Sequence, residues 1–472
     1  MKKEPKPAWR IDRSHMPFAL LIMGLAWAPA WFGGNRLLAW GVNAALFGAA
    51  ACLFEASVLV RGDGHPVGMK ALTPAWQLML VALGWAAFQA AALAPLAWTH
   101  PIWPMAREAL SGAADGGGVS VNPDLTALAL MRLLTCIAAF WLALQLCRDA
   151  RRARWLLQSV AAISTAYAGW GLIALTVSPG AVLGTDNPEM TGYVTSTFVN
   201  RNSFATYAGI GLTCVAGLMF RAYGREAASG AGSLRLKAAR WLEVTGGFGG
   251  ALLLGEAVIL TAALLLSVSR GGILSSLFGL GALGVRSYRG RLHSARRLWS
   301  SLAAAAAVAA AAIALFGDAI VGRISQDGLY DGGRIAVYKI VVGSIAASPW
   351  LGYGYGTFAD VFPMFRDRSI ADTGVWDKAH NSYLEILQGL GVVAGAMLIA
   401  SVAWLVVQCA LGAMRRRRDA SMPAVAAASG CIVGLHALVD FSLQIQAVAL
   451  TFAALLGAGI AQSVSSRSSM AD

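Results

Sequence analysis

The sequence predicts an all-α polytopic membrane protein with about twelve transmembrane helices. Two observations lead to this prediction. The 472-residue chain is 57% hydrophobic and only 13% charged, whereas soluble domains carry about 25% charged residues. Its apolar residues also gather in runs of about 20, the length that a helix needs to cross the hydrocarbon core. A bilayer is therefore the expected solvent.

The apolar runs follow one another along the whole chain. We expect helices at 17–33, 37–60, 75–98, 126–146, 156–178, 203–220, 247–268, 271–286, 299–316, 383–409, 421–440 and 445–463. The first run has no convincing small-residue cleavage site after it, so we expect it to be retained as a helix. No internal repeat of the kind found in many transporters is visible.

The basic residues predict the orientation. The net charge of +13 lies in short clusters between the apolar runs, such as Arg415 to Arg418. Placing both termini in the cytoplasm puts most Lys and Arg on the cytoplasmic side, as the positive-inside rule requires. This pattern favours a multi-pass protein of the bacterial inner membrane, in contact with membrane lipids. It argues against a nucleic-acid partner, which a basic stripe on a soluble domain would suggest.

The predicted topology divides the chain into three parts. Residues 1–316 hold helices one to nine, 317–382 form a large periplasmic loop, and 383–472 hold helices ten to twelve and the C-terminal tail. A loop of this length within a compact membrane protein is usually functional. We therefore expect the active site to face the periplasm.

Two arginines oppose the positive-inside trend. Arg201 lies in an Asn- and Ser-rich turn with Asn200 and Asn202, and Arg270 precedes two glycines in a hairpin between helices. If these helix ends pack together, the guanidinium groups would form a fork for a phosphate or diphosphate. Ordinary snorkelling to lipid headgroups is the alternative.

Three further ionisable residues are candidates for the site. His380, followed by Asn381, lies just before the tenth helix, and an imidazole suits the role of general base toward a sugar hydroxyl. It could equally be a hydrogen-bonded loop histidine. His436 and Asp440 are four residues apart on the predicted eleventh helix, so they would share one face. That pair would orient the site or form a structural hydrogen bond between helices.

The sequence shows no motif for binding a metal ion or a nucleotide. None has convincing metal-ligand spacing, and the chain has no phosphate-binding loop or nucleotide fingerprint. We therefore expect no metal and no cofactor. A transfer reaction on the outer face would need a pre-activated donor that is reached from the membrane.

Four segments resemble the O-antigen ligase and O-antigen polymerase-like superfamily of bacterial membrane glycosyltransferases. They are Ser196–Ala205 with Asn-Arg-Asn, Ser267–Leu274 with Ser-Arg-Gly-Gly, Ala379–Leu390 with His-Asn-Ser-Tyr, and His436–Gln446. Their order, spacing and predicted topology also match, so the resemblance covers most of the chain. Ser203 stands where many relatives have a histidine, which puts in doubt a role for that position.

The resemblance implies a GT-C-type fold and a metal-independent, inverting transfer from an undecaprenyl-diphosphate-linked glycan. By matching positions, Arg201 and Arg270 would bind the donor diphosphate, and His380 would activate the acceptor hydroxyl. Arg334 in the large loop matches a recurrent arginine and would assist. The acceptor would be lipid A–core for a ligase, or a lipid-linked repeat unit for a polymerase of surface polysaccharide or exopolysaccharide. The sequence leaves these two open, with protein O-glycosylation as a more distant third alternative.

Two other classes of protein stay as alternatives. A transporter or lipid-linked oligosaccharide flippase would be allowed by the helix count and by Glu55 and Glu256 within helices, but it should show repeat symmetry and broken helices. A structural scaffold for envelope assembly would not need Arg201, Arg270 and His380 together.

Overall fold

The computed structural model describes residues 15–91, 93–110, 117–227, 247–288, 332–370, 376–416 and 419–463. Within these ranges the regular secondary structure is helical, apart from a short antiparallel hairpin of β1 (Ala181–Val182) and β2 (Thr185–Asp186). Seven of the described helices are long and apolar enough to cross a membrane. The predicted class of all-α polytopic membrane protein is confirmed, while the count of twelve spans stays a prediction.

The helices have the following bounds. The seven candidate spans are α2 (Leu37–Arg61), α5 (Pro123–Leu146), α6 (Ala150–Val177), α7 (Arg201–Ala227), α9 (Phe248–Leu266), α14 (Ser382–Arg415) and α16 (Gln446–Ser463). The other described helices are α1 (His15–Trp27), α3 (Ala75–Ala90), α4 (Ile102–Ala109), α10 (Arg270–Tyr288), α12 (Gly332–Ala347), α13 (Phe358–Phe365) and α15 (Ser421–His436). Single 3₁₀ turns are η1 (Phe32–Gly34), η2 (Met69–Leu72), η3 (Leu96–Trp98), η4 (Pro188–Met190) and η5 (Ser442–Gln444).

Every predicted run within the described residues carries a helix, and the run 299–316 lies outside them. The boundaries differ where a proline follows. Helix α1 ends at Trp27 instead of 33, with Pro29 beyond it, and α3 ends at Ala90 instead of 98, with Pro95 beyond it. Proline removes a backbone donor and disfavours the helical conformation in the residue before it.

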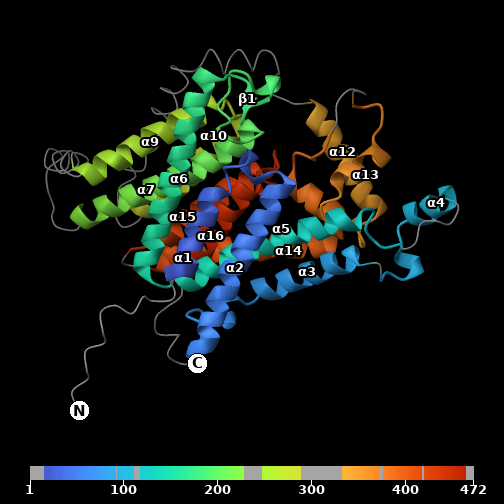
Figure 1. The fold of residues 1–472 in the computed structure, drawn as a ribbon, viewed down its shortest axis with the longest axis horizontal. Helices are drawn as coiled ribbons and strands as arrows, with labels where there is room; N and C mark the ends of the chain where they lie inside the picture. Colours follow the sequence, from blue (N-terminus) through green and yellow to red (C-terminus); the bar gives the residue numbers. More distant parts are fainter. Residues whose placement is uncertain are drawn as a thin grey trace.

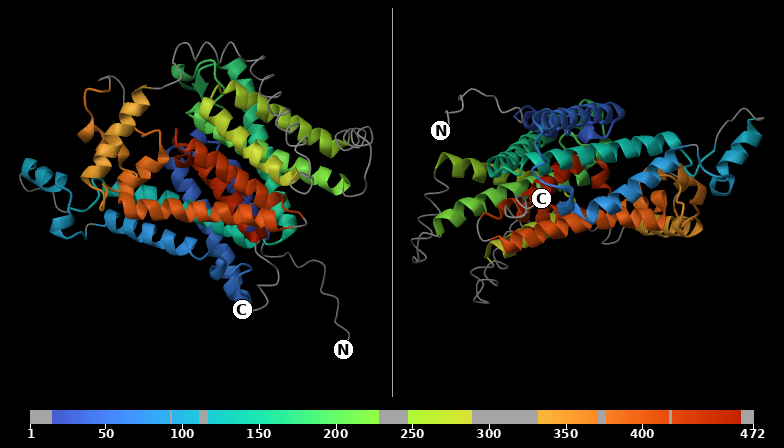
Figure 2. Two further views of the ribbon diagram at one scale, coloured as in Figure 1. Left: turned by 180° about the vertical axis from the view of Figure 1, so that it is seen from behind. Right: turned by 90° about the horizontal axis from the view of Figure 1, so that it is seen from below.

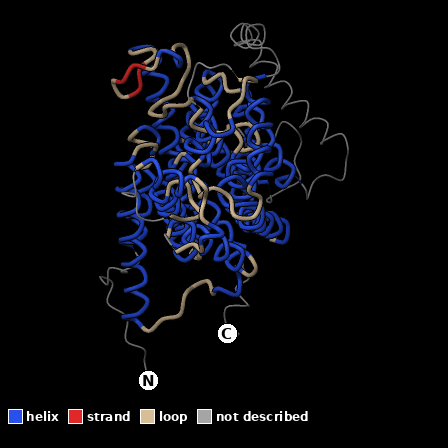
Figure 3. Tube along the Cα trace, turned by 90° about the vertical axis from the view of Figure 1, so that its right-hand side faces the viewer, coloured by secondary structure: helices blue, strands red, loops and turns tan. Residues whose placement is uncertain are grey.

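Helices α15 and α16 occupy the middle of the bundle. Helix α16 packs against α5, α14 and α15, and α15 packs against α7, α10 and α14. Figures 1 and 2 show α6, α7, α9 and α10 on one flank of this pair and α2, α3 and α5 on the other. The helical body and the peripheral hairpin are shown in Figure 3. Helix α16 is buried almost throughout and lies between the two flanks.

The predicted periplasmic loop contributes a small second core. Helices α12 and α13 bring Val341, Phe358 and Phe362 together with Ala379, next to the start of α14. Glycines let this unit approach α14 closely. Gly352 and Gly391 both have positive φ, and a Cβ on Gly352 would lie 2.3 Å from the Gly389 carbonyl oxygen. This backbone contact fixes the loop unit against the helix whose first turn follows His380.

Candidate functional site

Three helices begin, and one ends, at the same end of the bundle. Arg201 is the first residue of α7, Arg270 is the first of α10, Ser382 is the first of α14, and His436 is the last of α15. We call this the site end. Free N–H groups and the helix dipole make a helix N-terminus favourable for an anion. The dipoles of these three termini therefore favour negative charge at the site end.

A hydrogen bond joins the starts of α7 and α10. Ser269 Oγ donates to Asn202 Oδ1 over 2.8 Å. The two helices touch closely there, since a Cβ on Gly272 would lie 2.5 Å from the Ala205 Cβ. The first residues of these helices, Arg201 and Arg270, are thereby brought to one region, as the fork of arginines requires.

Arg201 is held in a setting that suits an anion. Its side chain is 8% exposed, and its Cζ lies 3.9 Å from the centre of the Tyr193 ring. Among the residues that the structure describes, Arg201 Nη1 is buried and has no hydrogen-bond partner. Asn200 Oδ1 accepts from the Asn202 N–H over 2.7 Å and shapes the first turn of α7. A buried donor without a partner is costly, and an anionic ligand would satisfy it.

The imidazole of His436 connects α7, α10 and α15. Its Nδ1 lies 2.6 Å from Thr206 Oγ1 and 3.0 Å from Ser442 Oγ. The ring also packs on Gly271, where an added Cβ would lie 3.0 Å from His436 Nε2. Only a residue without a side chain fits between α10 and this ring, which explains the glycine after Arg270.

Asp440 lies between the segments that carry His380 and His436. Its side chain is 1% exposed, and its Oδ1 accepts from the Phe441 N–H over 2.6 Å. Its carboxylate oxygens lie 4.0 Å from His380 Nδ1 and 3.9 Å from His436 Nε2. Burial raises the pKa of Asp440 to about 6, and the Phe441 N–H, Arg334 and Asn202 oppose this rise.

One part of the prediction for this pair is wrong. Helix α15 ends at His436, so Asp440 lies in the turn that follows and not on the same helix face. The turn is held by side chains from other elements: Asn381 Nδ2 donates to the Leu438 carbonyl over 3.1 Å, and Arg334 Nη1 donates to the Val439 carbonyl over 2.8 Å. Because the chain leaves the helical conformation after His436, these two carbonyl groups can accept hydrogen bonds from side chains of other segments.

His380 has a backbone conformation that is rare for its residue type. Its φ is +53°, in the left-handed region that costs a residue with a Cβ about 1–3 kcal/mol. The Tyr338 hydroxyl donates to its carbonyl over 2.8 Å, and Asn381 Oδ1 caps α14 by accepting from the N–H groups two and three residues further on. The side chain is 21% exposed, between the rings of Trp376 and Phe441. It is thus both held in place and reachable.

The structure therefore places His380, His436, Arg334 and Asn202 around Asp440, and it joins the helix starts that carry Arg201 and Arg270. Sequence reasoning missed the residues that position them, namely Thr206, Ser269, Gly271, Tyr338 and Ser442. All except Thr206 and Tyr338 lie within the four segments described above, so closer attention to the small polar residues of those segments would have found them. Nothing in the sequence around Tyr338 indicates its contact with His380.

These features define an integral membrane protein with a polar centre at the site end, built from arginines, histidines and a buried carboxyl group where helix termini meet. Residues 257–399 match the family described as O-Antigen ligase. This match over part of the chain supports the predicted resemblance to the O-antigen ligase and polymerase-like superfamily. The matched segment contains Arg270, Arg334 and His380, whereas Arg201 and Asp440 lie outside it. The comparison with curated proteins gave no match.

Proposed function

We propose that this protein is a glycosyltransferase of the bacterial inner membrane. It moves a glycan from an undecaprenyl-diphosphate donor to an acceptor hydroxyl on the periplasmic face. The observation that carries the proposal is the meeting of His380 and Asp440 with the starts of the two arginine-bearing helices. The family match supports an enzyme of the ligase or polymerase type.

The proposed orientation places the site end in the periplasm and both termini in the cytoplasm. Basic residues assigned to the cytoplasm lie at the opposite end of the bundle. There Arg148 donates to the Ala461 carbonyl over 3.1 Å, Arg221 pairs with Asp419 over 2.9 Å, and Arg416 donates to Gln462 over 2.9 Å. This arrangement agrees with the positive-inside rule.

In the proposed mechanism Arg201 and Arg270 bind the donor diphosphate together with the N-termini of α7 and α10. Charge grows on the diphosphate as the anomeric C–O bond breaks, so these fixed donors would bind the transition state more tightly than the ground state. Arg334 adds positive charge from the loop. The arginines would thus stabilise the leaving group without a metal ion.

The acceptor hydroxyl attacks the anomeric carbon from the face opposite the diphosphate, which inverts the configuration. His380 takes the hydroxyl proton as the new C–O bond forms, and undecaprenyl diphosphate leaves. The Asp440 carboxylate beneath His380 stabilises the resulting imidazolium, as a carboxylate does in other acid–base pairs. A ligase and a polymerase share this chemistry and differ only in the acceptor.

A complementation experiment tests the proposal. A strain that lacks the gene is restored with the wild type, His380→Ala, Arg201→Ala or Arg270→Ala at matched membrane levels. Loss of glycan from lipid A–core with accumulation of long lipid-linked chains identifies a ligase, whereas single repeat units alone identify a polymerase. Wild-type glycan in all three variants overturns the proposal and favours a transporter, flippase or scaffold.

A further inference from the structure

Glu385 carries a buried carboxyl group that the proposed mechanism does not use. It lies in the first turn of α14, in the same segment as His380, and the residue is only 8% exposed. An ionisable residue inside a transmembrane helix is costly and usually has a function. The contacts of this carboxyl group indicate what that function is.

One oxygen of Glu385 holds the backbone directly before His380. Its Oε2 accepts from the Ala379 N–H over 3.1 Å, while the Tyr338 hydroxyl donates to the His380 carbonyl over 2.8 Å. His380 has a φ of +53°, a conformation that persists in a residue with a Cβ only where the surroundings enforce it. Glu385 and Tyr338 therefore restrain His380 from both sides.

The same carboxyl group also contacts the segment that carries Asp440. It accepts a hydrogen bond from the side chain of Gln444, which lies in η5, the turn just after Asp440 and Phe441. The distance of 4.0 Å between His380 Nδ1 and Asp440 Oδ1 depends on how these two segments are held together. Glu385 is therefore placed to influence that distance, because it binds both segments.

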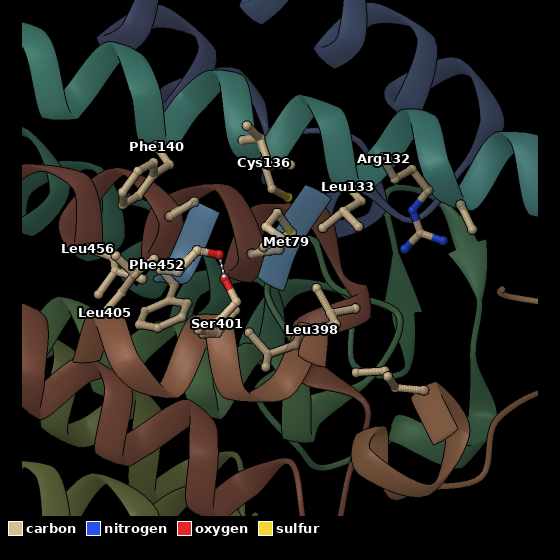
Figure 4. A pocket seen from close by; sticks show the side chains of 18 of the residues that line it. Met79, Arg132, Leu133, Cys136, Phe140, Leu398, Ser401, Leu405, Phe452 and Leu456 are labelled. Carbon is tan, nitrogen blue, oxygen red and sulfur yellow. Dashed lines mark hydrogen bonds between the residues drawn. The ribbon is translucent and has the colours of Figure 1, made fainter. Parts of the chain in front are cut away.

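Arg132 of α5 supports the same turn. Its guanidinium group donates to the Gln444 carbonyl and stacks on the Trp40 ring, 4.3 Å away. Arg132 and Glu385 both line a pocket of about 370 Å³ between α3, α5, α14 and α16. Figure 4 shows Arg132 at one end of this pocket and apolar side chains toward the other. Gln444 is thus bound through its side chain by Glu385 and through its carbonyl by Arg132.

The surroundings of Glu385 suit a carboxylate. Arg132 and Lys378 both interact with it electrostatically, and Ala379 and Gln444 both donate hydrogen bonds to it. Removing one member of a buried charge pair leaves the other uncompensated, whereas removing both charges together is often tolerated. Arg132 and Glu385 should therefore depend on each other.

We propose that Glu385 is a positioning residue which, together with Arg132, fixes His380 against Asp440. The inference rests on the proposed function, in which His380 takes the proton of the acceptor. Neither residue needs to touch the substrate, because Glu385 acts through the backbone before His380 and Arg132 acts through the turn after Asp440. The two residues should therefore set kcat, whereas the affinity for the donor depends on the arginine fork of α7 and α10.

Transfer kinetics test this with the purified full-length protein and with lipid-linked glycan and lipid A–core from the gene-deletion strain. Glu385→Gln keeps an oxygen for the Ala379 N–H but loses the charge, and Arg132→Gln loses the opposite charge. We expect each variant to lower kcat about tenfold, with the donor KM within about twofold of the wild type. The double variant should recover kcat to within about threefold, because neither buried charge is then left uncompensated.

Two further variants separate the hydrogen bonds from the burial of an acid. Glu385→Ala loses both hydrogen bonds as well as the charge, so it should lower kcat about 100-fold. Glu256→Gln is the matched control, since Glu256 lies on α9 and is also 8% exposed. It should keep the wild-type kcat. Melting temperatures check that each variant is folded.

Hydrogen exchange measured by mass spectrometry gives a readout that does not depend on transfer. Peptides covering 376–384 should exchange faster in Glu385→Ala than in the wild type, and at the wild-type rate in Glu256→Gln. Faster exchange that is confined to this segment shows that Glu385 restrains the backbone at His380.

Three outcomes overturn the inference. They are unchanged exchange or unchanged kcat in Glu385→Ala, a double variant that loses as much kcat as the product of the two single variants, and a rise in donor KM that accompanies a lower melting temperature. The last would indicate a general loss of stability. If the wild type transfers no glycan while exchange of 376–384 rises as expected, the proposed function is overturned and the restraint of this segment by Glu385 stands.

Discussion

The Nδ1 atom of His380 lies 4.0 Å from Oδ1 of Asp440. The two residues come from separate segments, one before α14 and one after α15, and the Ser382 N–H donates to the Ala437 carbonyl over 2.9 Å between those segments. The carboxyl group is almost fully buried, while the imidazole reaches the surface of the site. The imidazole of His380 is therefore accessible to an acceptor, and the carboxyl group of Asp440 next to it is shielded from solvent.

The pH dependence of transfer should report on Asp440. Burial raises the pKa of its carboxyl to about 6, so the group is neutral below that pH and ionised above it. Only the ionised form stabilises the His380 imidazolium, and the rate should therefore rise as the pH increases through 6. Asp440→Asn should lower kcat at pH 7.5 by about 10- to 100-fold, the effect of losing one charge-assisted contact.

Two controls accompany that variant. Asp377→Asn removes an acid of the same segment as His380 that is 68% exposed, and it should leave the rate unchanged. Because the folded pKa of Asp440 is raised, its stabilising contribution is present at low pH and is lost as the pH rises through about 6. Asp440→Asn should therefore not lower the melting temperature at pH 8. An unchanged pH profile in this variant would contradict the assigned role.

The two arginines should be intolerant of lysine. Lysine keeps the charge but loses the planar fork that binds a diphosphate. We expect Arg201→Lys and Arg270→Lys to reduce kcat/KM by about 10²-fold, and the glutamine variants to reduce it further. Arg36→Gln is a matched control, since Arg36 is an exposed arginine stacked on Phe32. An equal loss of kcat/KM in the Arg36, Arg201 and Arg270 variants would indicate a general effect of removing positive charge.

Gly271 should be sensitive to a single methyl group. A Cβ there would lie 2.9 Å from His436 Cδ2, whereas a Cβ on Gly281 of the same helix meets nothing within 4 Å. Gly271→Ala should therefore displace the His436 ring and lower activity at least tenfold in a transfer assay. Gly281→Ala should keep full activity and gain up to about 1 kcal/mol of stability from helix propensity. Full activity of Gly271→Ala would show that the ring position is unimportant.

Removing the Tyr338 hydroxyl should loosen His380 without touching the site. Tyr338→Phe deletes the bond to the His380 carbonyl, so we expect a several-fold lower kcat, with the donor KM unchanged. Tyr353→Phe is the control, because its hydroxyl donates to the Ser344 carbonyl within the same loop unit. Kinetics and melting temperatures of both variants separate positioning of His380 from a general loss of loop stability.

Much of the fold could be predicted because membrane insertion leaves a local signal. Apolar runs of sufficient length indicate helices wherever they occur, and the described runs all carry them. The errors arose at helix ends. The prolines after α1 and α3 were read as part of apolar runs, and the chain leaves α15 at His436 because Asn381 and Arg334 bind the carbonyls of the next turn.

By itself the sequence determined the membrane class, the resemblance to the O-antigen ligase and polymerase-like superfamily, and the choice of Arg201, Arg270, Arg334 and His380 as candidates. Hydropathy, charge sign and residue type are properties of short segments. Only the tertiary structure decided that Asp440 lies between His380 and His436, and that a cavity with Arg132 at its polar end opens beside Ser382. These relationships depend on which helices pack together. Packing is governed by contacts between residues far apart in the chain, which leave no periodic pattern within any one segment.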